Sequence, residues 1–292
     1  MAAEITRILS DLHYGDPASR VRSLDALGPL FDGADRIVFN GDTLETRPSP
    51  ISSQTDETRR EFLEFARHKV PRCTLITGNH DADLSDTHSL DLLGGIVLVT
   101  HGDVLFDELV PWSRELPQIR QLFREQLALL TPAQREDPGE RLAACKRACG
   151  KVRLPHDPHG RGLWQRVLLT ARIFWPPQYP LAMIRAWREL PDRAAAFARE
   201  FRPGSRFVLV GHTHRPGVWL RPGSVVINTG SFRPPFGCYA VDVSPEWVVV
   251  RRVRHRQGNF ALGRVVASFA LAPTDENSGA VSTILPTLAP TR

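Results

Sequence analysis

Five short segments of the chain contain the aspartate, asparagine and histidine side chains that bind divalent metal ions in proteins. They are SDLH with Asp11 and His13, NGDTLE with Asp42, TGNHD with Asn79, His80 and Asp81, THGD with His101, and GHTH with His212 and His214. In the first and last segments the two donors are two residues apart, so each pair projects to one side of an extended chain. The segments therefore offer many oxygen and imidazole ligands for one site.

The number of these donors predicts two cations rather than one. Three Asp or Asn oxygens and four imidazoles exceed the ligand set of one tetrahedral ion, and the segments lack the cysteines of a structural zinc site. A carboxylate such as Asp42 can bridge two cations about 3.5–4 Å apart, the spacing of two-metal phosphoryl chemistry. Water held between the cations becomes hydroxide near neutral pH and is the expected nucleophile. The donor set suits Mn, with Fe or Zn as alternatives.

Each of the five segments directly follows a short apolar run of the type that forms a buried strand. The runs cover residues 5–10, 36–39, 73–77, 95–100 and 207–210. A helix-like stretch at 55–69 lies between two of them, and this alternation predicts an α/β layered core. The carboxyl ends of strands in an open α/β sheet line one crevice, so the five segments are expected to converge there.

The rest of the chain divides by composition. Residues 111–206 hold 18 Lys and Arg against 9 Asp and Glu, a net charge of +9, whereas the remainder holds 19 against 23, or −4. Helix-like, proline-punctuated sequence fills this basic part, and strand-like runs return at 217–220, 224–228, 238–243 and 247–253. We expect a catalytic domain of residues 1–110 and 207–271, a basic helical insertion at 111–206, and a disordered tail at 272–292 rich in Pro, Thr and Ser.

Within the insertion, residues 162–187 contain apolar side chains at helical spacing. One predicted face holds Trp164, Leu168, Ala171 and Trp175, and a second, beyond two prolines, holds Met183, Ile184, Trp187 and Leu190. Such stripes form a packed helical hairpin in many proteins. The interspersed arginines also suit a lid that meets acyl chains and headgroup phosphates, with peripheral membrane contact. Both interpretations stay open.

The five segments, in this order, resemble the calcineurin-like metallophosphoesterases over about 210 residues from Asp11 onward. The resemblance implies a two-sheet β-sandwich flanked by helices, with an inserted helical region. It also implies that one metal is held by Asp11, His13 and His214, the other by Asn79, His101 and His212, with Asp42 between them. His80 is implied to face the substrate and stabilise or protonate the departing oxygen, with Asp81 orienting its ring. Arg215, next to the last histidine, is placed to contact a phosphate.

One branch of that family, the UDP-2,3-diacylglucosamine hydrolases, is similar in SDLH, GDxxE, HGD and GHTHRP and has a helical insertion between the last two histidine segments. This chain departs from the branch at His80, where the branch has arginine, and its insertion is longer. Cleavage of a lipid-linked pyrophosphate is therefore an alternative to the general expectation, which is hydrolysis of a phosphomonoester, phosphodiester or pyrophosphate.

Two other functions fit parts of the sequence. A nuclease would use the basic insertion to hold a phosphate backbone, although the aromatic residues of the insertion have aliphatic neighbours rather than the polar rims of base-stacking sites. A binding scaffold without catalysis would lack metal ligands, and all the expected ligands are present. The expected partner is thus a phosphorylated small molecule or an amphipathic lipid, with nucleic acid disfavoured.

The cellular location is predicted from three features. The first residues, MAAEITRIL, lack a secretory signal pattern, and no run of eighteen residues is apolar and uncharged. The cysteines Cys73, Cys145, Cys149 and Cys238 fit no disulfide framework or zinc pattern and are interpreted as reduced thiols. We expect a cytoplasmic protein that can be peripheral to the membrane.

Overall fold

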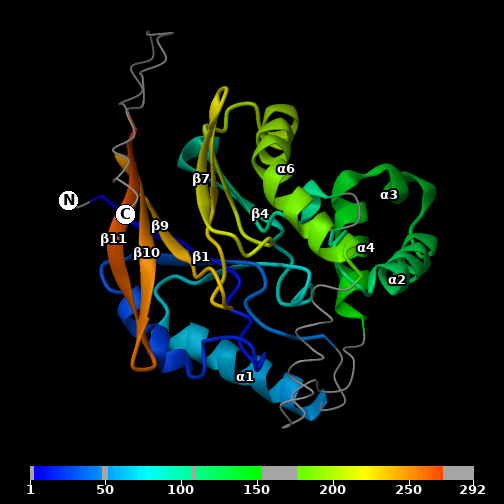
Figure 1. The fold of residues 1–292 in the computed structure, drawn as a ribbon, viewed down its shortest axis with the longest axis horizontal. Coiled ribbons are helices and arrows are strands. Elements are labelled where there is room, and N and C mark those ends of the chain that lie inside the picture. Colours follow the sequence, from blue (N-terminus) through cyan, green and yellow to red (C-terminus); the bar gives the residue numbers. More distant parts are fainter. Residues whose placement is uncertain (1–2, 48–51, 107–108, 153–175, 272–292) are drawn as a thin grey trace.

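The computed structural model describes residues 3–47, 52–106, 109–152 and 176–271. Within these ranges the strands form a six-stranded and a five-stranded sheet that pack against each other, with helices on their outer faces (Figure 1). The predicted α/β fold, a two-sheet sandwich flanked by helices, is confirmed.

The first sheet has a parallel half and an antiparallel half. Its strands, in spatial order, are β11 (Asn259–Ala270), β10 (Trp247–Arg256), β9 (Tyr239–Val243), β1 (Thr6–Leu9), β2 (Arg36–Asn40) and β3 (Thr74–Ile76). Strands β1, β2 and β3 are parallel, whereas β9, β10 and β11 are antiparallel to their neighbours. The carboxyl ends of the three parallel strands therefore lie at the same edge of this sheet.

The second sheet has a parallel centre with antiparallel edges. Its order is β4 (Ser89–Leu92), β5 (Val97–Thr100), β6 (Phe207–Val210), β8 (Ser224–Asn228) and β7 (Gly217–Arg221). Strands β5, β6 and β8 are parallel, and β4 and β7 each pair antiparallel at an edge. Strands β5 and β6 are adjacent although more than a hundred residues separate them in sequence.

Successive residues of the central strands face different layers, which is why these runs are apolar throughout. In β1, Ile8 packs between the two sheets, whereas its neighbour Leu9 packs on the outer face of the first sheet. In β6, Leu209 packs between the sheets, and Val208 faces the outer side of the second sheet. Both faces of each sheet are thus buried, and the protein has a helix–sheet–sheet–helix arrangement.

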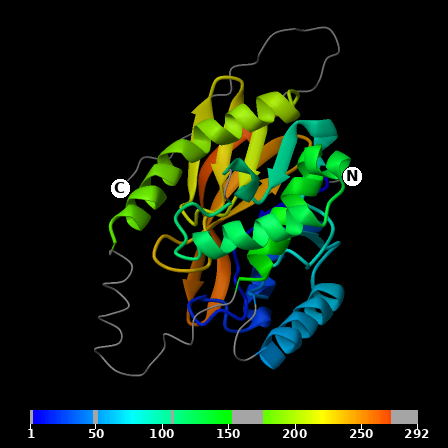
Figure 2. The ribbon, with the colours of Figure 1, turned by 90° about the vertical axis from the view of Figure 1, so that its right-hand side faces the viewer.

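Two groups of helices form the outer layers. Helix α1 (Ser52–Lys69) and the 3-10 helix η1 (Leu24–Leu30) cover the first sheet, where Phe62 and Leu27 are fully buried. Helix α6 (Gln178–Phe201) crosses the outer face of the second sheet (Figure 2). Two further 3-10 turns, η2 (Leu93–Gly95) and η3 (Asp103–Leu105), flank β5.

The described part of residues 111–206 is helical and contains no strand. It comprises α2 (Leu116–Ala128), α3 (Pro132–Glu136), α4 (Pro138–Gly150) and α6. Helix α2 packs against α4 around buried Ile119, Cys145 and Cys149. The apolar face predicted at Trp164, Leu168, Ala171 and Trp175, and the tail predicted at 272–292, lie outside the described residues.

The face predicted in α6 is wrong in part. Leu190 is buried, but Ile184 is 40% exposed, and the buried side of the helix is completed by Ala186, Ala194 and Ala198. Residues four apart share a helical face, so Leu190 lies with Ala186 and Ala194 rather than with Ile184. The small alanine side chains allow α6 to lie close to the second sheet.

Two strands were not predicted from the sequence. Strand β4 has the pattern SLDL, whose alternating exposed residues give a weak apolar signal. Strand β11 contains Gly263 and Arg264, and the β10–β11 ladder has register shifts between Val250 and Val253. These irregularities interrupt the alternation by which a strand is recognised.

Candidate metal centre

The five predicted segments meet at the carboxyl ends of five parallel strands. Asp11 and His13 follow β1, Asp42 follows β2, the segment Asn79–Asp81 follows β3, His101 follows β5, and His212 and His214 follow β6. The His212 backbone N–H donates to the Asp11 carboxylate at 3.1 Å and so joins the loops of the two sheets, whereas that of His80 donates to Asp42 Oδ1 at 2.9 Å and joins two loops of the first sheet. The expected convergence thus occurs, at an edge shared by both sheets.

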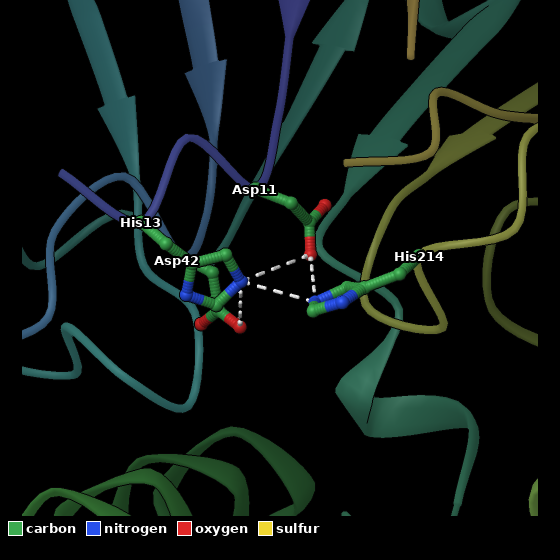
Figure 3. Close-up of side chains that lie close together, drawn as sticks. All are labelled: Asp11, His13, Asp42 and His214. Carbon is green, nitrogen blue, oxygen red and sulfur yellow. Dashed lines mark hydrogen bonds and ion pairs between the residues drawn. The ribbon is translucent and has the colours of Figure 1, made fainter. Parts of the chain in front are cut away.

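A first group of donor atoms comprises Asp11, His13, Asp42 and His214, all within 4.8 Å of one another (Figure 3). Nε2 of His13 lies 3.0 Å from Nε2 of His214 and 3.8 Å from Oδ2 of Asp42. Nε2 of His214 lies 3.2 Å from Oδ1 of Asp11. Three of these side chains are fully buried and His214 is 29% exposed, so the group opens to solvent on the side of His214.

A second group comprises Asp42, His101 and His212, again within 4.8 Å. Nε2 of His101 lies 3.4 Å from Oδ1 of Asp42. Asp42 therefore belongs to both groups, and its two oxygens face different histidines: Oδ2 faces His13 and Oδ1 faces His101. This is the arrangement that a carboxylate between two cations requires.

The histidines of the second group each have one ring nitrogen fixed by the backbone and one left without a partner. Nδ1 of His101 donates to the Asn40 carbonyl at 3.0 Å, and Nε2 of His212 donates to the Leu109 carbonyl at 2.7 Å. Such bonds fix the tautomer and orient the other nitrogen toward a metal. Among the described residues, His101 Nε2, His212 Nδ1 and the buried Asn79 Oδ1 have no hydrogen-bond partner. These unpaired donors fit divalent cations, because buried polar atoms are otherwise paired.

The backbone around the donors is unusual. Asp11, His13, Asp42, His212 and His214 all have positive φ, between 49° and 68°. Non-glycine residues adopt this left-handed conformation rarely, although Asp, Asn and His tolerate it best. Strained backbone of this kind clusters at functional sites, where the surrounding structure holds it in place.

Two glycines of the motifs are required because neighbouring atoms leave no room for a side chain, and not because the backbone has a positive φ. A Cβ atom at Gly78 would collide with the Asp42 carboxylate, and one at Gly211 would collide with the carboxylate of Asp11. The G in GNHD and the G in GHTH therefore leave room for the aspartates of two other segments. This explains why a glycine stands before the ligand-type residues in both motifs.

The charges of the site act in different directions on its side chains. Burial lowers the pKa of His13 and of His212, the latter to about 4, so both rings are neutral at pH 7. Burial opposes ionisation of Asp42, but His80 and His101 outweigh it and hold its pKa well below the usual range. Burial is likewise outweighed at His101, where Asp42 raises the pKa to about 10. A cation at His101 must therefore displace a proton.

The expected role of Asp81 in orienting the His80 ring is wrong. Asp81 accepts backbone N–H groups of Asp42, Thr43, Leu44 and Gly78, at 2.6 to 3.2 Å, and so ties the loops after β2 and β3 together. Burial raises its pKa to about 6, and the Asp42 charge adds to this shift. Asp81 is thus a loop-positioning residue, because its acceptors are directed at the backbone.

Glu45, and not Asp81, orients the His80 ring. Its Oε2 lies 2.6 Å from Nδ1 of His80, and Arg47 donates to both of its oxygens at 2.7 Å. Nε2 of His80 is left facing the centre, 3.7 Å from Oδ2 of Asp42. The spacing Asp42-x-x-Glu45 was the available sequence signal, since a residue three positions after a ligand can return to the same site.

Lys146 of α4 was not singled out from the sequence. Its side chain is 1% exposed, and Nζ donates to the Thr77 carbonyl at 2.6 Å and lies 3.4 Å from Oδ2 of Asp103. Thr77 immediately precedes the GNHD segment, and Asp103 is the aspartate of THGD. A helix of the basic region is therefore anchored behind the metal centre by a buried cation.

Arg215 lies at the surface, where its guanidinium is 5.7 Å from the ring centre of Trp187. The indole of Trp187 donates to the Thr213 carbonyl at 2.8 Å, between the two histidines of GHTH. Phe236 contacts the same indole edge to face at 5.3 Å. Helix α6 is thus linked directly to the loop that carries His212 and His214.

Solved structures with low sequence identity align with the chain. A predicted phosphoesterase from Streptococcus pneumoniae TIGR4 is 16% identical over 93% of this chain and 99% of its own, with a TM-score of 0.39. Vps29 from Chaetomium thermophilum is 12% identical over 94% and 99%, with a TM-score of 0.44. A dimetal phosphatase from Danio rerio is 10% identical over 86% and 96%, with a TM-score of 0.41.

The family comparison covers strands β1 to β6 and the metal centre. No curated protein sequence matches the chain. The model of the calcineurin-like phosphoesterase family matches residues 7–216, a range that runs from β1 to the loop after β6 and includes every donor of both groups. On this match, the chain belongs to the calcineurin-like phosphoesterase family.

Proposed function

We propose that the protein is a metal-dependent phosphoesterase that hydrolyses a phosphomonoester, phosphodiester or pyrophosphate at a pair of divalent cations. The observation that carries the proposal is the position of Asp42, whose two carboxylate oxygens face two separate groups of histidine donors. The family match supports hydrolysis of phosphate esters in general. The donor chemistry, oxygen and imidazole without thiolate, favours Mn, with Fe or Zn as alternatives.

In this proposal Asp11, His13 and His214 would hold one cation, Asn79, His101 and His212 would hold the other, and Asp42 would be shared between them. Cations held there would supply Lewis acidity and activate water for attack. His80 faces the substrate with Nε2 and stabilises or protonates the departing oxygen. Glu45 accepts a hydrogen bond from the Nδ1–H of His80, and this bond keeps the ring in one orientation. Arg215 contacts a substrate phosphate.

The test is hydrolysis of p-nitrophenyl phosphate and bis(p-nitrophenyl) phosphate, with bound metal counted by mass spectrometry. We expect turnover that depends on Mn, about two ions per chain by the two-metal chemistry, and loss of both in Asp42→Asn and His212→Ala. The matched controls are Asp56→Asn and His68→Ala, which change exposed residues of α1 outside the site. Full turnover in Asp42→Asn protein would contradict the assigned centre.

An amphipathic substrate is a second, more specific candidate, favoured by the surface beside GHTH. Leu181 is 62% exposed and Ile184 is 40% exposed, and both precede Trp187 on α6 at spacings of three residues. Phe236, also 40% exposed, packs on Trp187. Apolar side chains that continue from the metal centre along a helix suit acyl chains of a lipid-linked phosphate or pyrophosphate, with peripheral membrane contact.

This candidate is tested with Leu181→Asp/Ile184→Asp protein and a diacylated nucleotide sugar in mixed micelles. We expect turnover of the lipid to fall by about tenfold or more, because two apolar contacts with the acyl chains are lost. Turnover of p-nitrophenyl phosphate should be unchanged. The control is Leu129→Asp, because Leu129 is 77% exposed at the end of α2. Equal losses on both substrates would reject the lipid candidate. Salt-sensitive cleavage of DNA would favour the nuclease alternative.

A cytoplasmic location, with the membrane as a peripheral contact, is part of the same proposal. All four cysteines are free thiols, as expected in a reducing compartment. None of the helices in the described ranges combines the length and the apolar character needed to cross a bilayer.

A further inference from the structure

A cavity of about 390 Å³ lies outside the metal centre, between the loop that follows β8 and the β10–β11 hairpin. Its walls include Arg20, Phe232, Val253, His255 and Phe260. None of the donors of the two metal groups lines it. Its volume falls in the range of about 300–1,000 Å³ that is typical of small-molecule sites.

The walls of this cavity are positively charged without an opposing acid. Arg20 is its cationic side chain and His255 its imidazole, and no Asp or Glu lines it. Among the described residues, neither the Arg20 guanidinium nor the His255 ring nitrogens have a hydrogen-bond or ion-pair partner. The adjoining segment 247–271 contains five arginines and no acidic residue. An unpaired guanidinium in a concave, basic region attracts an anion.

Three of the other lining residues, Phe232, Val253 and Phe260, have apolar side chains. Phe232 and Phe260 are 1% and 2% exposed, and their rings meet edge to face at 5.0 Å. The His255 ring stacks on Phe260 with 4.6 Å between ring centres. Val253 adds an aliphatic side chain from the same strand. The two phenylalanine rings therefore form the floor of the cavity, while half-buried Val253 and the exposed His255 ring offer surface that a planar apolar group can contact.

The cavity is joined to the metal centre through the backbone of Asp11. Ser231, which lines the cavity, donates its hydroxyl to the Asp11 carbonyl at 3.1 Å, and the Phe232 N–H donates to the same carbonyl at 3.1 Å. A molecule in the cavity therefore rests against the segment that fixes the position of Asp11.

We propose that this cavity is a second ligand site, which takes a small anion that carries a flat aromatic ring. The acid group of the ligand pairs with Arg20, and the ring lies against Val253 and the His255 ring, above the floor formed by Phe232 and Phe260. The ligand needs both an anionic group and a flat ring, because an unpaired arginine lies beside apolar and aromatic side chains in the same cavity. The proposal is independent of the reaction at the metal centre.

The probe is naphthalene-1-sulfonate, an anion with a planar ring that phosphoesterases do not hydrolyse. Binding to the full chain is measured by titration calorimetry and by saturation-transfer NMR, with and without a metal chelator. We expect saturable binding of one molecule per chain, with equal affinity in both conditions, since the cavity is separate from the metal donors. Neutral naphthalene-1-sulfonamide and ring-free methanesulfonate are expected to bind at least about tenfold more weakly.

Variants locate the site. Arg20→Gln is expected to lower the affinity for the probe by about tenfold or more, whereas Arg20→Lys should retain most of it. Val253→Trp should block binding by filling the cavity. Arg22→Gln is the matched control, because Arg22 is exposed and donates to the Pro17 carbonyl. Circular dichroism identifies any variant that fails to fold. No saturable binding, equal affinity of the sulfonamide, or equal losses in Arg20→Gln and Arg22→Gln would overturn the proposal.

Discussion

Oε2 of Glu45 lies 2.6 Å from Nδ1 of His80, so the ring that faces the metal centre is oriented by a residue of the β2 loop. Arg47 pairs with both oxygens of this carboxylate, and its charge, together with that of His80, lowers the Glu45 pKa despite the opposing effect of burial. The Glu45 carboxylate is therefore ionised at neutral pH. The contact fixes the orientation of the His80 ring, which is 12% exposed.

We predict that Glu45→Gln lowers kcat by about 10- to 100-fold, as expected when the partner of a functional histidine is replaced. KM and bound metal should change little, because Glu45 is paired with His80 and Arg47. Glu45 lies outside the two groups that share Asp42 but forms a third candidate group with His13 and His80, so bound metal is counted in the variant. The measurement is the pH profile of kcat with a chromogenic phosphate ester. Glu64→Gln, an exposed change on α1, is the control. An unaltered profile in Glu45→Gln protein would remove the positioning role.

Gly211→Ala is predicted to damage the metal centre although it replaces none of the metal-donor residues. The added Cβ would collide with the carboxylate of Asp11 and with the Ser10 side chain. We expect metal affinity to fall by about tenfold or more, because Asp11 must move. Gly204→Ala is the matched control, since an alanine Cβ there has no neighbour within 4 Å. Similar metal titrations of the two variants would show that the close packing is not needed.

Lys146→Met is predicted to lower the free energy of unfolding by about 3–5 kcal/mol, because it leaves the buried Asp103 carboxylate without its cation. Urea unfolding measures the change. Lys151→Met, at the exposed end of the same helix, should stay within about 0.5 kcal/mol of the parent protein. The double variant Asp103→Asn/Lys146→Met should recover part of the loss. Strict additivity of the two single changes would rule out the pairing.

The stability of the metal-free protein is predicted to fall as pH rises from about 7 to about 10. Folding raises the pKa of His101 from 6.5 to about 10, because Asp42 outweighs the effect of burial. A raised pKa in the folded state gives stability that is complete below the unfolded value and is lost as pH passes the folded value. The loss should be of the order of a few kcal/mol. Urea midpoints of chelator-treated protein at several pH values measure it.

His101→Gln protein is the comparison for this experiment. It should be less stable than the parent at pH 7, and its stability should vary less between pH 7 and 10 because the titrating group is gone. Bound Mn should also flatten the profile of the parent, since a cation replaces the His101 proton. Identical pH profiles of parent and variant without metal would contradict the assigned pairing with Asp42.

The order of strands and donors was predictable because it depends on local sequence. Apolar runs such as 36–39 and 207–210 identify strands buried on both faces, and each ends in a cluster of polar donors. Since parallel strands place their carboxyl ends at one edge, the sequence alone assigns Asp42 and His212 to one site. Strand β11 was not predicted, because Gly263 and the bulges of its ladder obscure the alternation.

The sequence by itself determined the fold class, the family and the set of donor residues, because these depend on residue types and their order along the chain. Only the tertiary structure decided which carboxylate orients His80, that Asp81 holds backbone loops, that Lys146 reaches behind the centre, and that a basic cavity adjoins Asp11. The physical reason is the separation of the contacting residues along the chain. Such contacts join residues far apart in the chain through side-chain directions, which periodicity and composition do not specify.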